Sequence, residues 1–277
     1  CVQLGLSCME EIYRVGGWLD LAVTLPDDRA RTKSGRVYID EFCRARDIPL
    51  VKSANVNDAA VLDAVAAAEL NWLFIIGWSQ IARARLLALP RHGVLGIHPT
   101  LLPEGRGRAA IPWTILKGLP RTGVTLFKMD SGVDTGPILA QEELPVAPDE
   151  TARSLYDRVN AAHRTLIARA WPDLVADRLA PQPQDERYAT TWPGRAPEHG
   201  RIDPKSMTVT ETDRLVRAVT DPYPGAFVDL PRGRLRVWAG TRHPDDADPS
   251  RAVAIALTDG TYYATRYTWE PLPETSA

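Results

Sequence analysis

The chain has 277 residues, of which 44% are hydrophobic and 25% charged, and its formal net charge is −2. This is the composition of an ordinary globular protein, long enough for one large core and a smaller module. The near-neutral balance argues against a nucleic-acid-binding protein, because phosphate-tracking surfaces usually raise the Lys and Arg content. The sequence contains no apolar run of about 18 residues and no basic-then-apolar leader, so we expect no membrane contact and a cytoplasmic location.

The first half of the chain alternates between helical and strand-like patterns. Apolar residues recur at helical spacing in residues 56–70, and a short apolar run at 72–76 is typical of a buried parallel strand. A helix over 81–89 and a strand over 94–97 complete a strand-helix-strand unit. This alternation predicts a three-layer α/β domain.

Polar residues follow the predicted strands of this domain. Residues 78–80 follow one strand and His98 follows the next, at the edge where α/β sheets bind ligands. A further strand over 124–129 places Asp130 and Asp134 in the loop after it. That loop approaches His98 if the strands are adjacent.

Two helices and a proline-rich segment come next. A short helix is expected over 111–117 and a long one over 151–179, where Pro172 is expected to kink or split the helix. The prolines that follow favour extended backbone. We therefore expect residues 181–200 to form a connector between a domain over 1–180 and a module over 201–277.

The C-terminal module is predicted to be rich in β-structure. A threonine-capped helix over 210–219 opens it. Residues 254–257 and 261–265 then flank Asp259-Gly260, a dipeptide suited to a tight hairpin turn because both residues tolerate positive φ. A small β-barrel or sheet is expected.

Two motifs carry most of the functional information. Residues 96–108 read GIHPTLLPEGRGR, and residues 130–136 read DSGVDTG. Together they resemble the folate-dependent formyltransferases, which include methionyl-tRNA, amino-sugar and amino-acid N-formyltransferases. In that family the first motif usually reads Asn-x-His, and the second carries a catalytic aspartate. The family histidine corresponds to His98 and the aspartate to Asp134, while Gly96 stands where the family has asparagine.

The resemblance covers most of the chain, since residues 201–227 also resemble the family's C-terminal module. It implies a Rossmann-like catalytic domain with a smaller, barrel-like β-rich module. The family normally opens with a short apolar strand just before residue 1, so a first strand is expected to precede Cys1. The resemblance also implies N10-formyltetrahydrofolate as cosubstrate, held by the residues Ile76, Gly77, Trp78, Ile81, Met129 and Asp130. For Trp78, the role of an ordinary core aromatic is an equal alternative.

The expected chemistry is attack of a neutral amine on the formyl carbon. His98 would polarise the formyl group, and Asp134 would orient the ring, favour its charged form and relay the amine proton. The alternative is that the two are an ordinary loop histidine and turn residue. Gly96 lacks the side-chain amide with which the family asparagine helps to hold the formyl oxygen. That role would pass to backbone N–H groups, to a water in the vacated space, or to Gln80 or Thr100.

Basic side chains near the first motif are candidates for acceptor binding. Arg106 and Arg108 could clamp an acceptor carboxylate or phosphate, and Gln80 is a further candidate for acceptor binding. Solvated arginines or internal salt bridges are equal alternatives. A second basic loop, residues 33–36, either borders the acceptor entrance or is a solvated loop.

Metal ligands are scattered along the chain, so we expect no metal site. The three cysteines cannot all pair, which favours reduced thiols. The histidines outside the first motif lack a partner at metal-ligand spacing. The cysteines are Cys1, Cys8 and Cys43, and these histidines are His92, His163, His199 and His243.

The sequence therefore predicts an N-formyltransferase acting on a primary amine of a small molecule, such as a nucleotide-linked amino sugar or an ornithine-like amino acid. Methionyl-tRNA formyltransferase is the alternative transferase, and the near-neutral charge weighs against a tRNA partner. A formyl-tetrahydrofolate hydrolase and a noncatalytic folate-binding protein are alternatives from other classes. The oligomeric state is left open, with a homodimer as one possibility.

Overall fold

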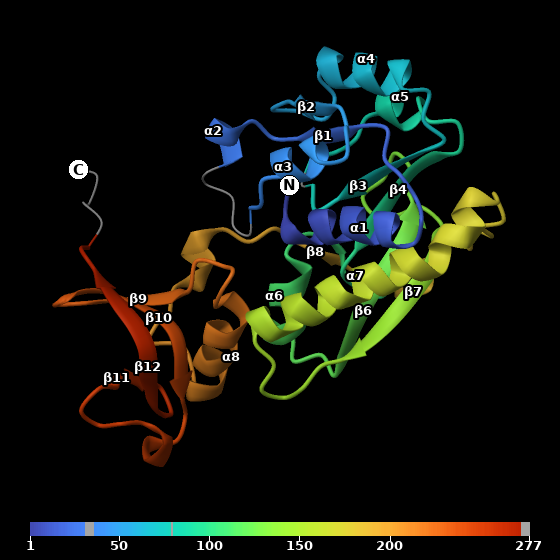
Figure 1. The fold of residues 1–277 in the computed structure, drawn as a ribbon. Coiled ribbons are helices and arrows are strands. Elements are labelled where there is room, and N and C mark those ends of the chain that lie inside the picture. The colour runs from blue at the N-terminus through green and yellow to red at the C-terminus, as the bar shows by residue number, and fades with distance from the viewer. Residues whose placement is uncertain (31–35, 79, 273–277) are drawn as a thin grey trace. The chain divides into compact units, whose positions relative to one another are not determined.

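The computed structural model describes residues 1–30, 36–78 and 80–272 (Figure 1). Residues 33–35 of the second basic loop lie outside this range. The chain forms two compact units. The first comprises residues 1–110, 122–145 and 157–193, and the second comprises 111–121, 146–156 and 194 onward. The expected connector, residues 181–200, is therefore divided: residues 181–193 belong to the first unit and residues 194–200 to the second.

The strands of the first unit form two sheets and a short pair. β1 (Ala22–Thr24) and β2 (Leu50–Lys52) form a parallel two-stranded sheet. The main sheet has the order β3-β4-β6-β7 and contains β3 (Trp72–Ile76), β4 (Gly93–His98), β6 (Arg121–Lys128) and β7 (Ile138–Pro145). β3 and β4 are parallel, whereas β6 runs antiparallel to β4. The strands expected over 72–76, 94–97 and 124–129 are confirmed.

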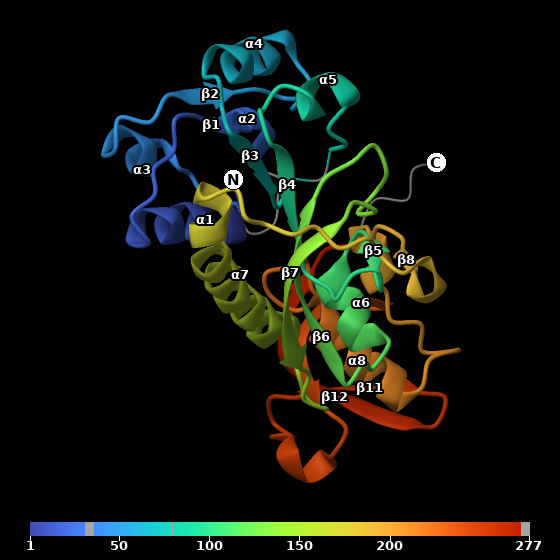
Figure 2. The same ribbon diagram turned by 90° about the vertical axis from the view of Figure 1, so that its right-hand side faces the viewer.

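Helices cover these sheets. They are α1 (Gln3–Arg14), α2 (Asp27–Ala30), α3 (Asp40–Arg44), α4 (Ala59–Ala67), α5 (Ala84–Leu87) and α7 (Ala152–Val175). Figure 2 shows α4 and α5 beside each other, where Val61, Val65 and Leu86 share one apolar core. The predicted helices over 56–70 and 81–89 are confirmed, the second only as a single turn.

Two ion pairs connect the long helix α7 to other elements of the first unit. Arg164 Nε lies 3.1 Å from Glu11 Oε2 on α1, and Arg169 Nη1 lies 3.0 Å from Glu142 Oε2 on β7. Figure 1 shows α7 running across β7. The helix continues through Pro172 to Val175, so the split expected at this proline does not occur.

An apolar cavity of about 310 Å³ lies between the two sheets of the first unit. Residues 21–23 around β1 and all five residues of β3 line it, with side chains of α1 and α4. Among the described residues, β3 has β4 as its one neighbour in the sheet, and β1 has β2. The strands β1 and β3 therefore border the same cavity without pairing.

The second unit is an antiparallel sheet with helices. The sheet order is β11-β12-β10-β9, with β9 (Ala226–Leu230), β10 (Gly233–Thr241), β11 (Val253–Leu257) and β12 (Gly260–Glu270). α6 (Ala110–Leu116) and α8 (Val209–Val219) are its helices. Thr208 caps α8 in a reciprocal box with Glu211, since each side chain bonds the backbone N–H of the other.

The predicted hairpin is present in this sheet, one residue earlier than expected. Leu257 pairs with Gly260, so the turn residues are Thr258 and Asp259. The fold is therefore the expected α/β domain with a smaller β-rich module.

Candidate active site

The imidazole of His98 is fixed at the carboxyl end of β4. Its Nε2 lies 2.8 Å from the carbonyl oxygen of Gly105. Because a carbonyl can only accept, Nε2 carries the hydrogen and donates it. In the neutral ring the lone pair is therefore on Nδ1.

The carboxylate of Asp134 faces that nitrogen. Asp134 Oδ2 lies 3.5 Å from His98 Nδ1, and the two side chains are 17% and 10% exposed. The same oxygen accepts a hydrogen bond from the backbone N–H of Gly107, at 2.8 Å. β4 and β6 are adjacent, as the proximity argument required, but antiparallel, so the loop after β6 folds back to reach His98.

The loop that contacts both residues is held by the connector. Arg106–Gly107 (β5) pairs in parallel with Thr191–Trp192 (β8). Thr190 accepts a hydrogen bond from Gly105 N through its Oγ1, at 2.8 Å, and one from Arg106 N through its carbonyl, at 2.9 Å. At Gly107, where φ is +105°, a Cβ would collide with the carbonyl oxygen of Trp192. The close pairing therefore requires glycine.

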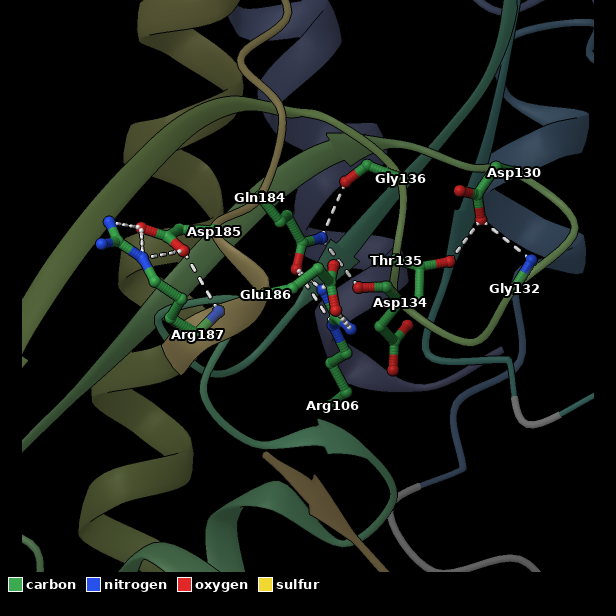
Figure 3. Close-up of polar contacts among 10 residues, drawn as sticks. All are labelled: Arg106, Asp130, Gly132, Asp134, Thr135, Gly136, Gln184, Asp185, Glu186 and Arg187. Atoms are coloured by element: carbon green, nitrogen blue, oxygen red, sulfur yellow. Dashed lines mark hydrogen bonds and ion pairs between the residues drawn. The ribbon is translucent and has the colours of Figure 1, made fainter. Parts of the chain in front are cut away.

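The two arginines of the first motif differ in their surroundings. Arg106 is 8% exposed and pairs with Glu186, with Nη2 at 2.6 Å from Oε1 (Figure 3). This hydrogen-bonded pair lowers the pKa of the Glu186 carboxyl. The contacts of Arg106 favour the internal-salt-bridge alternative over acceptor binding. Arg108 is exposed, and within the described part of the chain its guanidinium has no ion-pair partner.

At Gly96, where the family has asparagine, neighbouring side chains leave no room for a side chain. A Cβ on Gly96 would lie 2.8 Å from the ring atoms Cε1 and Cζ of Phe127 and 3.3 Å from Met129 Cγ. These are closer than ordinary van der Waals contacts. The aromatic edge of Phe127 borders the space beside Gly96, which speaks against a water there.

Gln80 and Thr100, the two side chains expected to substitute for the asparagine, differ in their surroundings. The Gln80 amide accepts from Val56 N at 2.9 Å and donates to Ala54 O at 2.7 Å, so it ties the chain before α4. The Thr100 hydroxyl is buried and has no hydrogen-bond partner among the described residues. Of the two side chains, Thr100 is the one whose polar atom is buried without a partner among the described residues.

The residues expected to hold the folate occupy two segments. Ile76 ends β3, and Ile81 has a side chain that is 64% exposed. Trp78 Nε1 donates to Gln80 Oε1 at 3.1 Å. Of the six expected residues, Ile76 and Trp78 line the 310 Å³ cavity, while Gly77, Ile81, Met129 and Asp130 are not part of its lining.

The second folate segment is the loop after β6. Met129 is half-buried, and its N–H donates to Val94 O at 2.8 Å. Asp130 is exposed and accepts hydrogen bonds from Gly132 N at 2.9 Å and Thr135 Oγ1 at 2.7 Å (Figure 3). Its carboxylate therefore shapes its own loop.

Sequence reasoning missed the contribution of the connector. Gln184, Glu186 and Thr190 contact the two motif loops across 48 to 85 residues of sequence. A connector carries no hydrophobic periodicity that would place it, so only a structure reveals these contacts.

Membrane-spanning helices and metal-binding clusters are both absent from the described residues. No helix there is both long and apolar enough to cross a bilayer. No group of three or more His, Cys, Asp or Glu side chains is arranged to hold a metal ion in that part of the chain.

Comparison with known proteins confirms the family resemblance. A family described as formyl transferase matches residues 25–171, and its C-terminal domain matches residues 195–266. The methionyl-tRNA formyltransferase of Trichlorobacter lovleyi is 30% identical, over 84% of this chain and 74% of the relative. That of Agathobacter rectalis is 29% identical, over 93% of this chain and 84% of the relative.

Solved structures show the same fold. WlaRD, described as a sugar 3N-formyl transferase in the presence of dTDP and 5-N-formyl-THF, matches 95% of this chain and 94% of its own, with a TM-score of 0.69 at 16% identity. The chain therefore belongs to the formyl transferase family and is an enzyme of folate-dependent formyl transfer.

Proposed function

We propose that this enzyme transfers a formyl group from N10-formyltetrahydrofolate to a primary amine of a small molecule, with His98 and Asp134 as its catalytic residues. One observation carries the proposal. Nδ1 of His98 faces the Asp134 carboxylate at 3.5 Å, while Nε2 is occupied by Gly105. Nδ1 is thus the ring nitrogen that is left to exchange a proton, and the Asp134 carboxylate lies beside it.

This arrangement suits the removal of a proton from the attacking amine. As the amine nitrogen bonds to the formyl carbon it becomes positively charged, and its N–H proton can pass to Nδ1 of His98. The imidazolium that forms has the Asp134 carboxylate beside it, and opposite charge stabilises it. Its Nδ1–H can then return the proton to the leaving nitrogen.

The oxyanion of the tetrahedral intermediate needs donors that replace the family asparagine. Loss of one such donor typically costs about 10²–10³ in rate. The Thr100 hydroxyl is buried with no hydrogen-bond partner among the described residues, and it lies two residues after His98. We assign it as the candidate donor, together with backbone N–H groups.

The donor site is consistent with a flat, partly apolar ligand. Each of the two expected segments presents one exposed apolar side chain, Ile81 at 64% and Val133 at 49% exposure. Such side chains pack against the faces of a pterin, while backbone groups bond its edge. When bound, the formyl-folate supplies the activated one-carbon unit.

The acceptor we favour is an amine on an anionic small molecule, either a nucleotide-linked amino sugar or an ornithine-like amino acid. Arg108 is exposed, lies one residue beyond the Gly107 N–H that bonds Asp134, and can clamp a phosphate or carboxylate. The formal net charge of −2 fits a small ligand better than an extended polyanion.

Methionyl-tRNA is the second candidate acceptor. The sequence relatives at 28–30% identity carry the name methionyl-tRNA formyltransferase. A C-terminal domain of the family is also present, over residues 195–266.

A purified-protein assay tests the proposal. Tetrahydrofolate release from N10-formyltetrahydrofolate is measured without acceptor, with a panel of amino sugars and diamino acids, and with methionyl-tRNA. Release that depends on a small amine supports the proposal, and release that depends on methionyl-tRNA selects the second candidate. Release without any amine indicates a hydrolase, and tight folate binding without release indicates a binding protein; either result overturns transfer.

A further inference from the structure

The side chain of Gln184 joins two loops of the candidate site. Its Nε2 donates to the carbonyl oxygens of Asp134, at 2.8 Å, and Gly136, at 2.7 Å. Its Oε1 accepts from Arg106 Nε at 3.0 Å and Arg106 Nη2 at 2.8 Å. Figure 3 shows Gln184 between Arg106 and the 134–136 loop. Both amide hydrogens and the amide oxygen are thus in use.

Arg106 is itself fixed from its other side. Nη1 and Nη2 bond the two carboxylate oxygens of Glu186 at 2.9 and 2.6 Å. A two-pronged pair of this kind defines the orientation of the guanidinium plane. The arginine that donates to Gln184 is therefore held in one orientation.

The contacts close a ring that includes the catalytic carboxylate. Gly107, next to Arg106 in the chain, donates its N–H to Asp134 Oδ2 at 2.8 Å. Gln184 holds the Asp134 backbone and Arg106, so backbone and carboxylate of Asp134 are tied to the same two-residue strand. Gly105, which accepts from His98 Nε2, precedes that strand. Movement of this loop would displace both catalytic side chains.

Asp134 also has a less common backbone conformation, which the hydrogen bonds from Gln184 help to hold. Its φ is +55°, in the left-handed region that non-glycine residues seldom adopt. A residue in this region persists only where its surroundings determine it. The two hydrogen bonds from Gln184, to the carbonyls of Asp134 and Gly136, supply that constraint.

We propose that Gln184 is a positioning residue, which keeps the Asp134 carboxylate on the Gly107 N–H and in line with His98. The inference rests on the proposed function, since it concerns the same catalytic pair. It adds that the connector, through a single amide, completes a site whose reacting groups all come from the two motif loops.

Two substitutions separate positioning from simple packing. Gln184→Leu removes all four hydrogen bonds at similar volume. Gln184→Glu keeps the acceptor for Arg106 and loses the donors to the Asp134 and Gly136 carbonyls. If Gln184 serves only to satisfy the buried Arg106, the glutamate variant keeps full activity. If Gln184 positions Asp134, both variants lose activity.

The expected result is a kcat 10- to 100-fold lower in both variants, with an unchanged KM for formyl-folate, because small misplacements of a catalytic group slow the chemical step. Hydrogen exchange of a peptide covering residues 105–108 should become faster, since the Gly107 N–H loses its fixed acceptor. Arg187→Ala is the matched control: Arg187 pairs with Asp185 in the same connector, and its side chain is 81% exposed. This variant should match the unmodified enzyme in both measurements.

Other outcomes overturn the inference. Full kcat in Gln184→Glu would show that the arginine contact alone matters, and a loss of kcat equal to that of Arg187→Ala would show a general effect of the connector. A raised KM with unchanged kcat would place Gln184 in substrate binding. His98→Ala and Asp134→Ala are assayed in parallel: if they stay active, the proposed function fails, whereas if they are inactive and Gln184→Glu is not, only this inference fails.

Discussion

Replacing His163 with leucine should make the stability of this fold less sensitive to acid. His163 lies on α7 and is fully buried, and its Nδ1 bonds the carbonyl of Val159 at 2.8 Å. Its Nε2 has no partner among the described residues. Burial lowers the pKa of His163 from 6.5 to about 4, so the folded protein holds this ring neutral.

The size of the effect follows from proton linkage. Below pH 6.5 the unfolded chain takes up a proton at His163, whereas the folded chain does so only near pH 4. Stability therefore falls as the pH is lowered through this window. At 1.36 kcal/mol per pKa unit, the loss between pH 7 and pH 5 is about 2 kcal/mol, and it approaches about 3 kcal/mol at pH 4.

The assay is denaturant unfolding of the unmodified chain and of His163→Leu at pH 7 and pH 5. The difference in unfolding free energy between the two proteins should move by about 2 kcal/mol in favour of leucine at the lower pH. His243→Leu, at an exposed histidine, is the control and should show no such movement. A difference that stays the same at both pH values would refute the reasoning, since a buried neutral histidine must oppose protonation.

Three further predictions concern the site. His98→Ala and Asp134→Ala should each reduce turnover about 10²–10⁴-fold without changing the melting temperature, and near-normal rates would remove the mechanism. Arg108→Ala should raise the KM for an anionic acceptor and leave kcat unchanged in steady-state kinetics, so an unaltered KM would exclude the clamp. Gly96→Asn should lower the unfolding free energy by about 1–3 kcal/mol in denaturant titration, because its Cβ meets the Phe127 ring; equal stability would show that the ring can move.

Long periodic elements of the fold were predictable from the sequence. The apolar periodicity of the sequence predicted a helix over 151–179, and the structure has α7 over Ala152–Val175. The threonine cap and the periodicity that follows predicted a helix over 210–219, and α8 spans Val209–Val219. Pro172 misled because a proline removes one hydrogen bond and crowds the preceding turn without necessarily ending the helix, and α7 continues for three residues beyond it. Strand direction was not predictable, since β6 has no local signal for running antiparallel to β4.

The site was predictable only where residues carry chemistry in a motif. His98 and Asp134 were found because each stands in a motif that resembles the family, and the loop after β6 folds back so that the two side chains face each other. Gln184 and Glu186 were missed because their roles depend on chain geometry 48 to 80 residues away. The environment of Gly96 was also hidden, since the Phe127 ring reaches it from a neighbouring strand. The strand expected before Cys1 stays a prediction.

The strands β1 and β3 border one apolar cavity of the first unit, and within the described residues they do not pair with each other. Strand borders that lack a neighbour recruit extended polypeptide, and an apolar lining favours Val-rich and Ile-rich sequence. An extended segment in this cavity would hydrogen-bond to both β1 and β3, and it would join the two-stranded and four-stranded sheets of the first unit into one sheet.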